Sequence, residues 1–209
     1  MNAKDIDNYI QRYTGRYEQY GYSPETLGWG RNGRQDVRFS VLGELAIRDG
    51  NASVLDVGCG FGDLYAFLKS RGWNGQYTGI DLVPVLVEKA KEIYPGISVF
   101  QNDIGDAAVE AADYVIASGI FNAQLDNEPN DTHIEQSLRR MFGLCNKAIC
   151  VDFRKDGSWH TDPAWALQRA KEMSKRVVLR HDYMPYEFAL IVVREDGISP
   201  LNTFQGYRY

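Results

Sequence analysis

Apolar residues along this chain fall into two patterns that alternate with each other. Short apolar runs of the kind found in buried strands occupy residues 54–57, 77–81, 97–100, 113–117 and 148–153. Most of the segments between them carry apolar residues at three- and four-residue steps, as amphipathic helices do. Strands that alternate with helices predict a parallel sheet with helices on both faces.

The last part of the chain breaks this alternation. Residues 177–183 and 187–193 are both β-rich, and only Met184, Pro185 and Tyr186 separate them. This pattern predicts an antiparallel hairpin at the end of an α/β fold. A length of 209 residues suits one such domain. We therefore expect a single domain over residues 1–209, with a helical cap or lid at 1–48 and the α/β core at 50–195.

The polar N-terminal region predicts a first helix with one aromatic stripe. Ile6, Tyr9, Tyr13, Tyr17 and Tyr20 follow each other at helical spacing. This stripe either packs on the core or forms a lid whose phenolic groups touch a ligand. In the second case Tyr20 is a candidate for contact with the substrate.

A second helix is expected over residues 34–48, immediately before the first strand. Arg31, Arg34 and Arg38 lie near its start. Charges at this spacing usually form a solvated face. Because these arginines precede the first strand so closely, one of them, with Arg34 as the candidate, is placed to hold a ligand carboxylate by bidentate contact.

The composition argues against several classes of function. A net charge of −5 disfavours a nucleic-acid backbone as the main partner. Cys59, Cys145 and Cys150 are too few and too irregular for a disulfide framework or a zinc cluster, and they suit a reducing, cytoplasmic setting. His133 and His160 fit no metal-ligand spacing, so surface positions are expected. No signal-peptide pattern or apolar run of membrane-spanning length is seen, so we expect no membrane partner.

A glycine turn follows the first predicted strand. The stretch VLDVGCGFGDL (54–64) places Gly58, Gly60 and Gly62 at alternate positions, just before a helix that starts near Asp63. Without Cβ atoms the backbone of this turn can pass close to a bulky ligand. The helix N-terminus points unpaired N–H groups at the same place. An adenosine-type cofactor is therefore the first hypothesis.

Further strand ends carry residues that suit such a ligand. Asp81 ends the second strand and is placed to accept the hydroxyls of a ribose. Asp103 and Ile104 follow the third strand and offer an acceptor for an exocyclic amine and an apolar wall for a purine. Ligands of open α/β sheets bind beyond the carboxyl ends of the strands. The alternative explanation is that both are ordinary turn acids. In that case both would have to follow strands at the same edge as the glycine turn by chance.

The spacing of the glycines distinguishes two classes of cofactor. The dinucleotide fingerprint G-x-G-x-x-G, counted from Gly58, requires a glycine at position 63, where this chain has Asp63. An acid, Asp56, instead precedes the glycines. Its charge is unfavourable beside a pyrophosphate and favourable beside a cationic ammonium or sulfonium group.

These motifs resemble those of one family. The stretch DVGCGFG (56–62) resembles the first motif of the class I S-adenosylmethionine-dependent methyltransferases, GID (79–81) their ribose-binding strand end, and NDI (102–104) their adenine-binding one. The resemblance implies a Rossmann-like, doubly wound sheet of seven strands in the order 3-2-1-4-5-7-6, with strand 7 antiparallel and helices on both faces. It also implies S-adenosylmethionine as cofactor and S-adenosylhomocysteine as product.

The resemblance assigns roles to single residues. Asp81 would bind the ribose hydroxyls, Leu82 would lie beside the adenine, and Ser118 would lie near the methionine end. Asp103 and the Ile104 N–H would bind the adenine edge. The full cofactor-binding set is Asp56, Gly58, Cys59, Gly60, Gly62, Asp81, Leu82, Asp103, Ile104 and Ser118, with Arg34 added as the carboxylate candidate.

The methyl acceptor is constrained less tightly. The Asn/Asp-Pro-Pro-aromatic motif of many nucleic-acid and glutamine methyltransferases is replaced by SGIFN at 118–122. With the acidic charge, this points away from DNA and towards an oxygen or nitrogen atom of a small polar metabolite. Candidate substrate contacts, chosen from the expected topology and joined by Tyr20, are Phe121, Asn122, Arg154 and Tyr183. His181 and Tyr186 on the hairpin are the catalytic candidates, with His181 as base or else as an ordinary strand histidine.

Three alternatives stay open at this point. The first is a protein or RNA methyltransferase with an open acceptor groove. The second is a nicotinamide-dependent reductase, which Asp63 disfavours. The third is a cofactor-binding or scaffold protein without catalysis. We expect a monomer or a homodimer in each case.

Overall fold

We describe a computed structural model of the chain over residues 1–29, 34–106, 108–154 and 159–195. Its seven-stranded sheet has the order β3-β2-β1-β4-β5-β7-β6, which confirms the expected topology. β7 runs antiparallel to both of its neighbours, and β1 to β5 pair in parallel. The strands are β1 (Val54–Val57), β2 (Tyr77–Asp81), β3 (Ser98–Gln101), β4 (Ala112–Ala117), β5 (Cys145–Arg154), β6 (Arg176–Met184) and β7 (Glu187–Val193).

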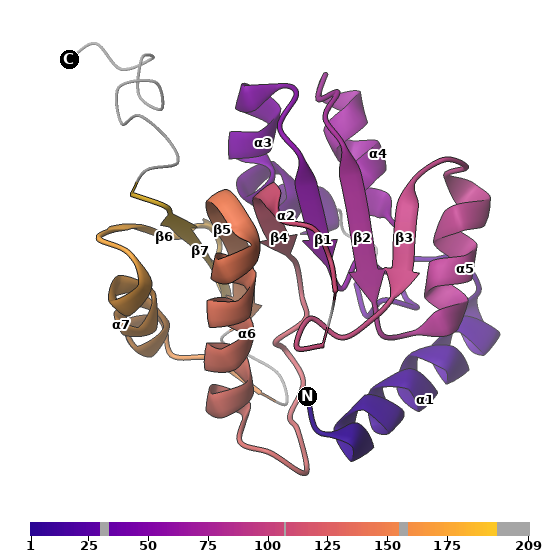
Figure 1. The fold of residues 1–209 in the computed structure, drawn as a ribbon. Coiled ribbons are helices and arrows are strands. Elements are labelled where there is room, and N and C mark those ends of the chain that lie inside the picture. The colour runs from indigo at the N-terminus through magenta and orange to yellow at the C-terminus, as the bar shows by residue number, and fades with distance from the viewer. Residues whose placement is uncertain (30–33, 107, 155–158, 196–209) are drawn as a thin grey trace.

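Helices cover both faces of this sheet (Figure 1). The alternation of side chains along β1 shows why: Leu55 and Val57 join the core under α6 and α7, whereas Val54 joins the core under α2 to α5. The helices are α1 (Ala3–Tyr20), α2 (Arg34–Leu42), α3 (Glu44–Asp49), α4 (Asp63–Ser70), α5 (Pro84–Ile93), α6 (Asn130–Leu144) and α7 (Pro163–Met173). No helix of the described residues is long and apolar enough to cross a membrane.

Two helix predictions need correction. The helix expected over 34–48 is interrupted at Gly43, where α2 ends and α3 begins. A Cβ at Gly43 would lie 2.8 Å from the Phe39 carbonyl oxygen and 2.9 Å from a methyl carbon of Leu68, so α4 packs directly against this break. Glycine is also a poor residue for continuing a helix.

The second correction concerns the start of α6. Thr132 and Glu135 have the spacing of a capping box, which predicts a helix start at Thr132. This prediction is wrong, because the helix already starts at Asn130. Asn130 anchors the preceding loop instead: its Oδ1 accepts a bond from the Leu125 N–H (3.0 Å), and its Nδ2 donates to the Ala123 carbonyl (2.8 Å). Thr132 therefore lies inside the first turn.

The N-terminal helix α1 lies across the carboxyl ends of the central strands, at the bottom of the view in Figure 1. Its contacts are with the edge of the sheet where the glycine turn and the loops after β2, β3 and β4 meet. This edge is where an α/β sheet of this topology binds its ligands.

Candidate active site

A cavity opens at the carboxyl edge of the sheet, where the strand order reverses between β1 and β4. Its volume is about 800 Å³ with the open solvent at its mouth included. The loops after the strands form the floor, and α1 with the segment behind it forms the roof. The floor residues include Gly58, Gly60, Asp81, Leu82, Asp103, Ile104, Ser118 and Gly119; the roof residues are Met1, Tyr9, Tyr13, Leu27 and Trp29.

The glycine turn forms the centre of the floor. Gly58 has a φ of 72°, and a Cβ added to it would overlap the Ile120 side chain, so only glycine suits this position. The N–H groups of Gly58 and Cys59 both donate to the Ile80 carbonyl, at 2.8 and 3.0 Å. These bonds hold the turn against the end of β2.

Asp81 joins the end of β2 to the glycine turn. Its Oδ2 accepts a bond from the Gly60 N–H (2.8 Å), and its Oδ1 accepts one from the Val83 N–H (2.9 Å). The side chain lines the cavity and is 9% exposed. Burial raises the pKa of Asp81, and the backbone bonds from Val83, Gly60 and Leu82 oppose that rise. Each carboxylate oxygen keeps a further lone pair for a hydroxyl donor in the cavity.

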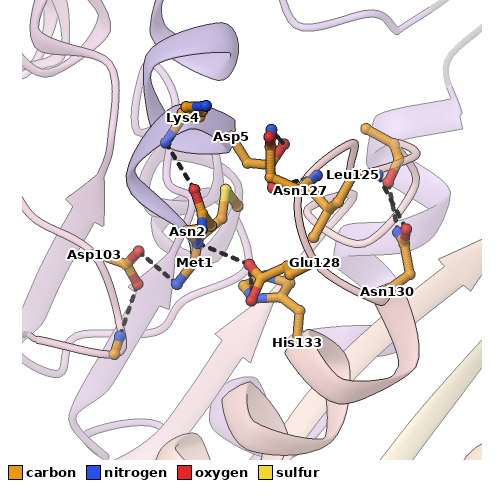
Figure 2. A network of polar contacts seen from close by, with 12 residues as sticks. Met1, Asn2, Lys4, Asp5, Asp103, Leu125, Asn127, Glu128, Asn130 and His133 are labelled. Carbon is orange, nitrogen blue, oxygen red and sulfur yellow. Dashed lines mark hydrogen bonds and ion pairs between the residues drawn. The ribbon is translucent and has the colours of Figure 1, made fainter.

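Asp103 lies at the end of the cavity nearest β3. Its Oδ2 is 3.2 Å from the terminal ammonium of Met1, and its Oδ1 accepts a bond from the Gly105 N–H (2.8 Å). Figure 2 shows Met1 between Asp103 and the loop before α6. Met1, which precedes α1, therefore reaches the floor of the cavity.

Asp5 attaches α1 to the loop before α6 (Figure 2). Its carboxylate is 3% exposed and accepts bonds from the Asp126 N–H (3.1 Å), the Asn127 N–H (3.1 Å) and the Asn127 side-chain amide (2.9 Å). Burial acts to raise the pKa of Asp5, but these hydrogen bonds outweigh it and the pKa is lowered. The Asn2 N–H, at the N-cap of α1, also donates a hydrogen bond to Glu128 Oε1 in the same loop (2.9 Å).

Comparison with known proteins decides the family. Residues 54–148 match a family model described as a methyltransferase domain. Rv1506c, a Mycobacterium tuberculosis protein that carries a provisional methyltransferase name, is 33% identical over 152 residues, which are 67% of this chain and 92% of that protein. The chain belongs to the class I S-adenosylmethionine-dependent methyltransferases.

Solved structures agree with this methyltransferase fold. Magnesium protoporphyrin IX methyltransferase from Synechocystis PCC 6803, solved with bound S-adenosylmethionine, has a TM-score of 0.66 and 16% identity, and the match covers 93% of this chain and 100% of that one. The N-methyltransferase NodS from Bradyrhizobium japonicum, in complex with S-adenosylhomocysteine, has a TM-score of 0.65 and 15% identity over 88% of this chain and 99% of that one. At these identities the likeness concerns the fold.

Three members of the predicted cofactor set lie beside the methyltransferase cavity without lining it. Asp56 is 4% exposed and accepts a bond from the Tyr77 hydroxyl (2.7 Å) on the α2 to α5 side of the sheet. Burial raises the pKa of Asp56 to about 7, with the Tyr77 bond opposing. Cys59 is buried next to Gly79. Gly62 is the N-cap of α4 and has a φ of 78°.

The predicted arginine is not at the cavity. Arg34 is exposed at the start of α2 and does not line the methyltransferase cavity, and Arg31 lies outside the described residues. Arg38 is the arginine that points inward, with 2% of its surface exposed. The sequence offers a signal for this, because Arg38 shares the buried side of α2 with Phe39 and Leu42.

The structure brings none of the predicted acceptor residues, Tyr183 included, to the cavity. Phe121 is 3% exposed and stacks on Phe153 in the core, with ring centres 5.6 Å apart. The Asn122 side chain accepts a bond from the Arg154 N–H (3.1 Å) and so joins the ends of β4 and β5. Tyr20 is exposed at the last turn of α1. None of these four residues lines the cavity.

The hairpin candidates are also away from it. His181 is exposed on β6, and Tyr186 is 59% exposed in the turn between β6 and β7. The turn is at the expected edge, because Arg154 pairs with Glu187. However, β5 and β7 separate β6 from the cavity beside β4. The catalytic roles of His181 and Tyr186 stay predictions, and the geometry adds no support to them.

One histidine expected at the surface is buried instead. His133 is 8% exposed and lines the cavity together with Ser137, one turn further along α6. Its Nδ1 is 3.6 Å from Glu128 Oε1, and burial lowers the pKa of His133. The sequence pattern that could have predicted this burial is the i, i+4 spacing of His133 and Ser137, which are adjacent to the core residues Ile134 and Leu138.

The sequence analysis did not predict the buried charged cluster behind the cavity wall. The guanidinium of Arg38 binds both carboxylate oxygens of Glu187, lies 3.7 Å from Asp152 through its Nε, and stacks on the Trp29 ring at 3.9 Å. Arg38 and Glu187 are 149 positions apart, so no local pattern pairs them. Among the described residues no group of His, Cys, Asp and Glu is arranged to hold a metal ion.

Proposed function

We propose that this methyltransferase transfers the methyl group of S-adenosylmethionine to an oxygen or nitrogen atom of a small polar metabolite. The observation that carries the proposal is the roof over the glycine turn. Tyr9, Tyr13, Leu27 and Trp29 cover the cavity floor that Gly58 and Gly60 form. A macromolecular acceptor needs an open approach to this floor, whereas a small molecule fits beneath such a roof.

The residues present fit the adenosine part of the cofactor. Asp81 has lone pairs left for ribose hydroxyls, and Leu82 and Ile104 supply apolar walls for an adenine ring. Asp103 can accept from the adenine amine, and there the amine would share or replace the contact of the Met1 ammonium. The Ile104 N–H is assigned to the adenine edge, as the family resemblance implies.

The residues around the glycine turn suit a cation. Asp56, Asp63 and Asp81 lie close enough for their charges to interact, and each disfavours ionisation of a neighbour. A positive ammonium or sulfonium group relieves this repulsion, whereas a pyrophosphate adds to it. Bound S-adenosylmethionine supplies a methyl group already activated on a sulfonium. The protein is then left to exclude water and to align the acceptor in line with that group.

The helix α1 is assigned the role of a lid. Tyr9 and Tyr13 line the cavity from above, and the Tyr9 hydroxyl lies 3.4 Å from the Ile120 carbonyl that follows β4. Asp5 holds the start of the helix on the loop before α6. The cytoplasmic setting and the monomer or homodimer belong to the proposal too; Cys59, Cys145 and Cys150 are free thiols.

The test has two stages. Calorimetry with S-adenosylmethionine and S-adenosylhomocysteine first measures cofactor binding. Transfer of label from tritiated S-adenosylmethionine is then followed with a panel of small hydroxy and amino compounds, and in parallel with the protein and RNA fractions of a cell extract. Label in a small product supports the proposal. Label only in protein or RNA overturns the small-molecule assignment, and binding without transfer to either fraction supports a non-catalytic role.

A further inference from the structure

Asp152 lies behind the cavity wall and touches the cavity through Ser118. Ala117 pairs with Val151 between β4 and β5, so the residue after each lies at the same level of the carboxyl edge. The Ser118 hydroxyl donates to Asp152 Oδ2 at 2.7 Å, and the Gly119 N–H donates to Oδ1 at 2.7 Å. Asp152 is 2% exposed, whereas Ser118 lines the cavity.

This geometry determines what Ser118 can do. Because its proton is engaged by Asp152, the lone pairs of its oxygen are the groups left for the cavity. Ser118 therefore presents a hydrogen-bond acceptor that is connected directly to a carboxylate. A hydroxyl group placed above Ser118 would donate a hydrogen bond to Ser118 Oγ, which itself donates to Asp152.

The surroundings favour proton uptake by Asp152. Its neighbours are Arg38 from α2, which neutralises one charge, and Glu187 from β7, which adds one. Burial raises the pKa of Asp152; Arg38, Ser118 and Gly119 oppose this rise, and Glu187 supports it. Two acids therefore share one buried guanidinium, and a proton on Asp152 restores neutrality.

The same cluster contains polar atoms without partners. Arg38 Nη1 and the Tyr183 hydroxyl are buried and have no hydrogen-bond partner among the described residues. Tyr183 lies close enough to Asp152, Glu187 and Arg38 to respond to their charges. Buried polar groups are normally satisfied, so a buried water belongs beside them.

We propose that Ser118 and Asp152 form the proton-accepting pair of this methyltransferase and that the acceptor is a hydroxyl group. The inference rests on the proposed function and narrows its acceptor to oxygen. A neutral amine can attack without losing its proton first, whereas a hydroxyl needs a base, so a built proton acceptor favours the hydroxyl.

The step balances as follows in atoms and electrons. The acceptor oxygen forms a bond to the methyl carbon while the carbon–sulfur bond breaks and its electron pair stays on sulfur. The hydroxyl proton passes to Ser118 Oγ, and the proton of Ser118 passes to Asp152 Oδ2. The products are a methyl ether, a neutral thioether and a protonated Asp152.

The first test needs no acceptor. In protein with ¹³C-labelled aspartate carboxyl groups, bound to S-adenosylhomocysteine, the Asp152 signal is assigned by its loss in Asp152→Asn. We expect its titration midpoint to lie above that of a free aspartate, which is about 3.9. Ser118→Ala should raise the midpoint further, because a hydrogen bond to the charged form is lost. A midpoint at or below that of a free aspartate in the wild type overturns the inference.

The second test follows turnover with matched small hydroxy and amino compounds and tritiated S-adenosylmethionine. We expect label on hydroxyl compounds only, and kcat lower by about 100-fold in Asp152→Asn and in Ser118→Ala. The double variant should be no slower than either single one, and Ser118→Thr, which keeps the hydroxyl, should restore turnover. Label on amines with unchanged kcat in the variants, or losses that multiply in the double variant, overturns the inference.

Affinity for S-adenosylhomocysteine separates the two proposals. Asp152→Asn should bind it within about three-fold of the wild type, because Asp152 does not line the cavity. Failure of the wild type to bind it contradicts the proposed function. If the wild type binds it, but the Asp152 midpoint is not raised or the losses multiply in the double variant, only the proton-accepting pair is contradicted.

Discussion

Buried carboxylates at the carboxyl edge distinguish this site at the level of single residues. Asp56 lies within β1, Asp81 ends β2 and Asp152 lies near the end of β5, and each is at least nine-tenths buried. Each is held by donors from its own surroundings: a tyrosine hydroxyl, two backbone N–H groups, or a serine hydroxyl with a backbone N–H. The sequence shows these acids, but their pKa values depend on burial and on one another.

Asp81→Asn should weaken binding of S-adenosylhomocysteine by about 10- to 100-fold. The carboxylate is assigned to two ribose hydroxyls, and a hydrogen bond to a charged group is worth about 1.5–3 kcal/mol. Calorimetry measures the change. Asp113→Asn is the matched control, because Asp113 also accepts a backbone N–H, that of Ser53 at 3.0 Å, but at the opposite edge of the sheet. Equal affinities for wild type and Asp81→Asn contradict the ribose assignment.

Asp56→Asn should flatten the dependence of stability on pH. The pKa of Asp56 is raised from 3.8 to about 7 in the folded state, so its protonated form contributes stability below pH 4 that is lost as pH rises through 7. The loss amounts to about 4 kcal/mol at most. Denaturant unfolding of both proteins between pH 4 and 8 measures it.

Tyr77→Phe is the counterpart of that variant. It removes the hydrogen bond that stabilises the charged form of Asp56, so the pKa of Asp56 should rise further. The loss of stability should then become larger and extend to higher pH. Parallel pH profiles in wild type and Asp56→Asn are incompatible with the raised pKa.

At the level of elements, α1 and the loop before α6 act as one unit over the cavity. Met1, which precedes α1, reaches Asp103 on the floor, and the middle of the helix supplies Tyr9 and Tyr13 to the roof. Polar bonds hold the helix start, whereas Tyr17 packs on Phe61 with ring centres 6.0 Å apart. Opening of the proposed lid would therefore have to break the Asp5 contacts.

Asp5→Ala should release the start of α1 without unfolding the core. The variant loses three hydrogen bonds to a charged group, so amide exchange in α1 should become at least about 10-fold faster while exchange in β1 and β4 stays unchanged. Hydrogen–deuterium exchange measures both. Asp7→Ala, an exposed position on the same helix, is the control. The lid assignment is in error if α1 exchanges equally in all three proteins.

At the level of the whole molecule, the cavity joins the two halves of the sheet. Its floor comes from β1 and β2 with the loop after β3 on one side and from the end of β4 on the other, and its roof comes from the N-terminal region. A cofactor in this place touches segments far apart in the sequence. Binding should therefore stabilise the fold as a whole.

S-adenosylhomocysteine at 100 times its Kd should stabilise the folded protein by about 2.7 kcal/mol. For a chain of this length this corresponds to a rise in Tm of roughly 5–10 °C. Differential scanning calorimetry measures the shift, and Asp81→Asn at the same concentration should shift less. An unchanged Tm at a concentration that saturates binding rules out cofactor binding selective for the folded state.

Most of the fold followed from local pattern. Glycines at 58, 60 and 62, continuous apolar strands and the hairpin at 184–186 are short-range signals, and they predicted the strand order through the family resemblance. Helix boundaries were less reliable. The break at Gly43 depends on packing against Leu68, and the start of α6 depends on bonds that Asn130 makes to its loop.

The sequence by itself determined the family and the location of the floor of the site. The reason is that the glycine turn and the acids near the strand ends are local features that a short stretch of sequence specifies. The tertiary structure alone decided what surrounds that floor. It turned Phe121 into the core, left Arg34 and His181 exposed, and buried His133 at the cavity. It also paired Arg38 with Glu187 and Asp152 with Ser118. These contacts join segments that only sheet pairing and helix packing bring together, and burial then determines how each charge behaves.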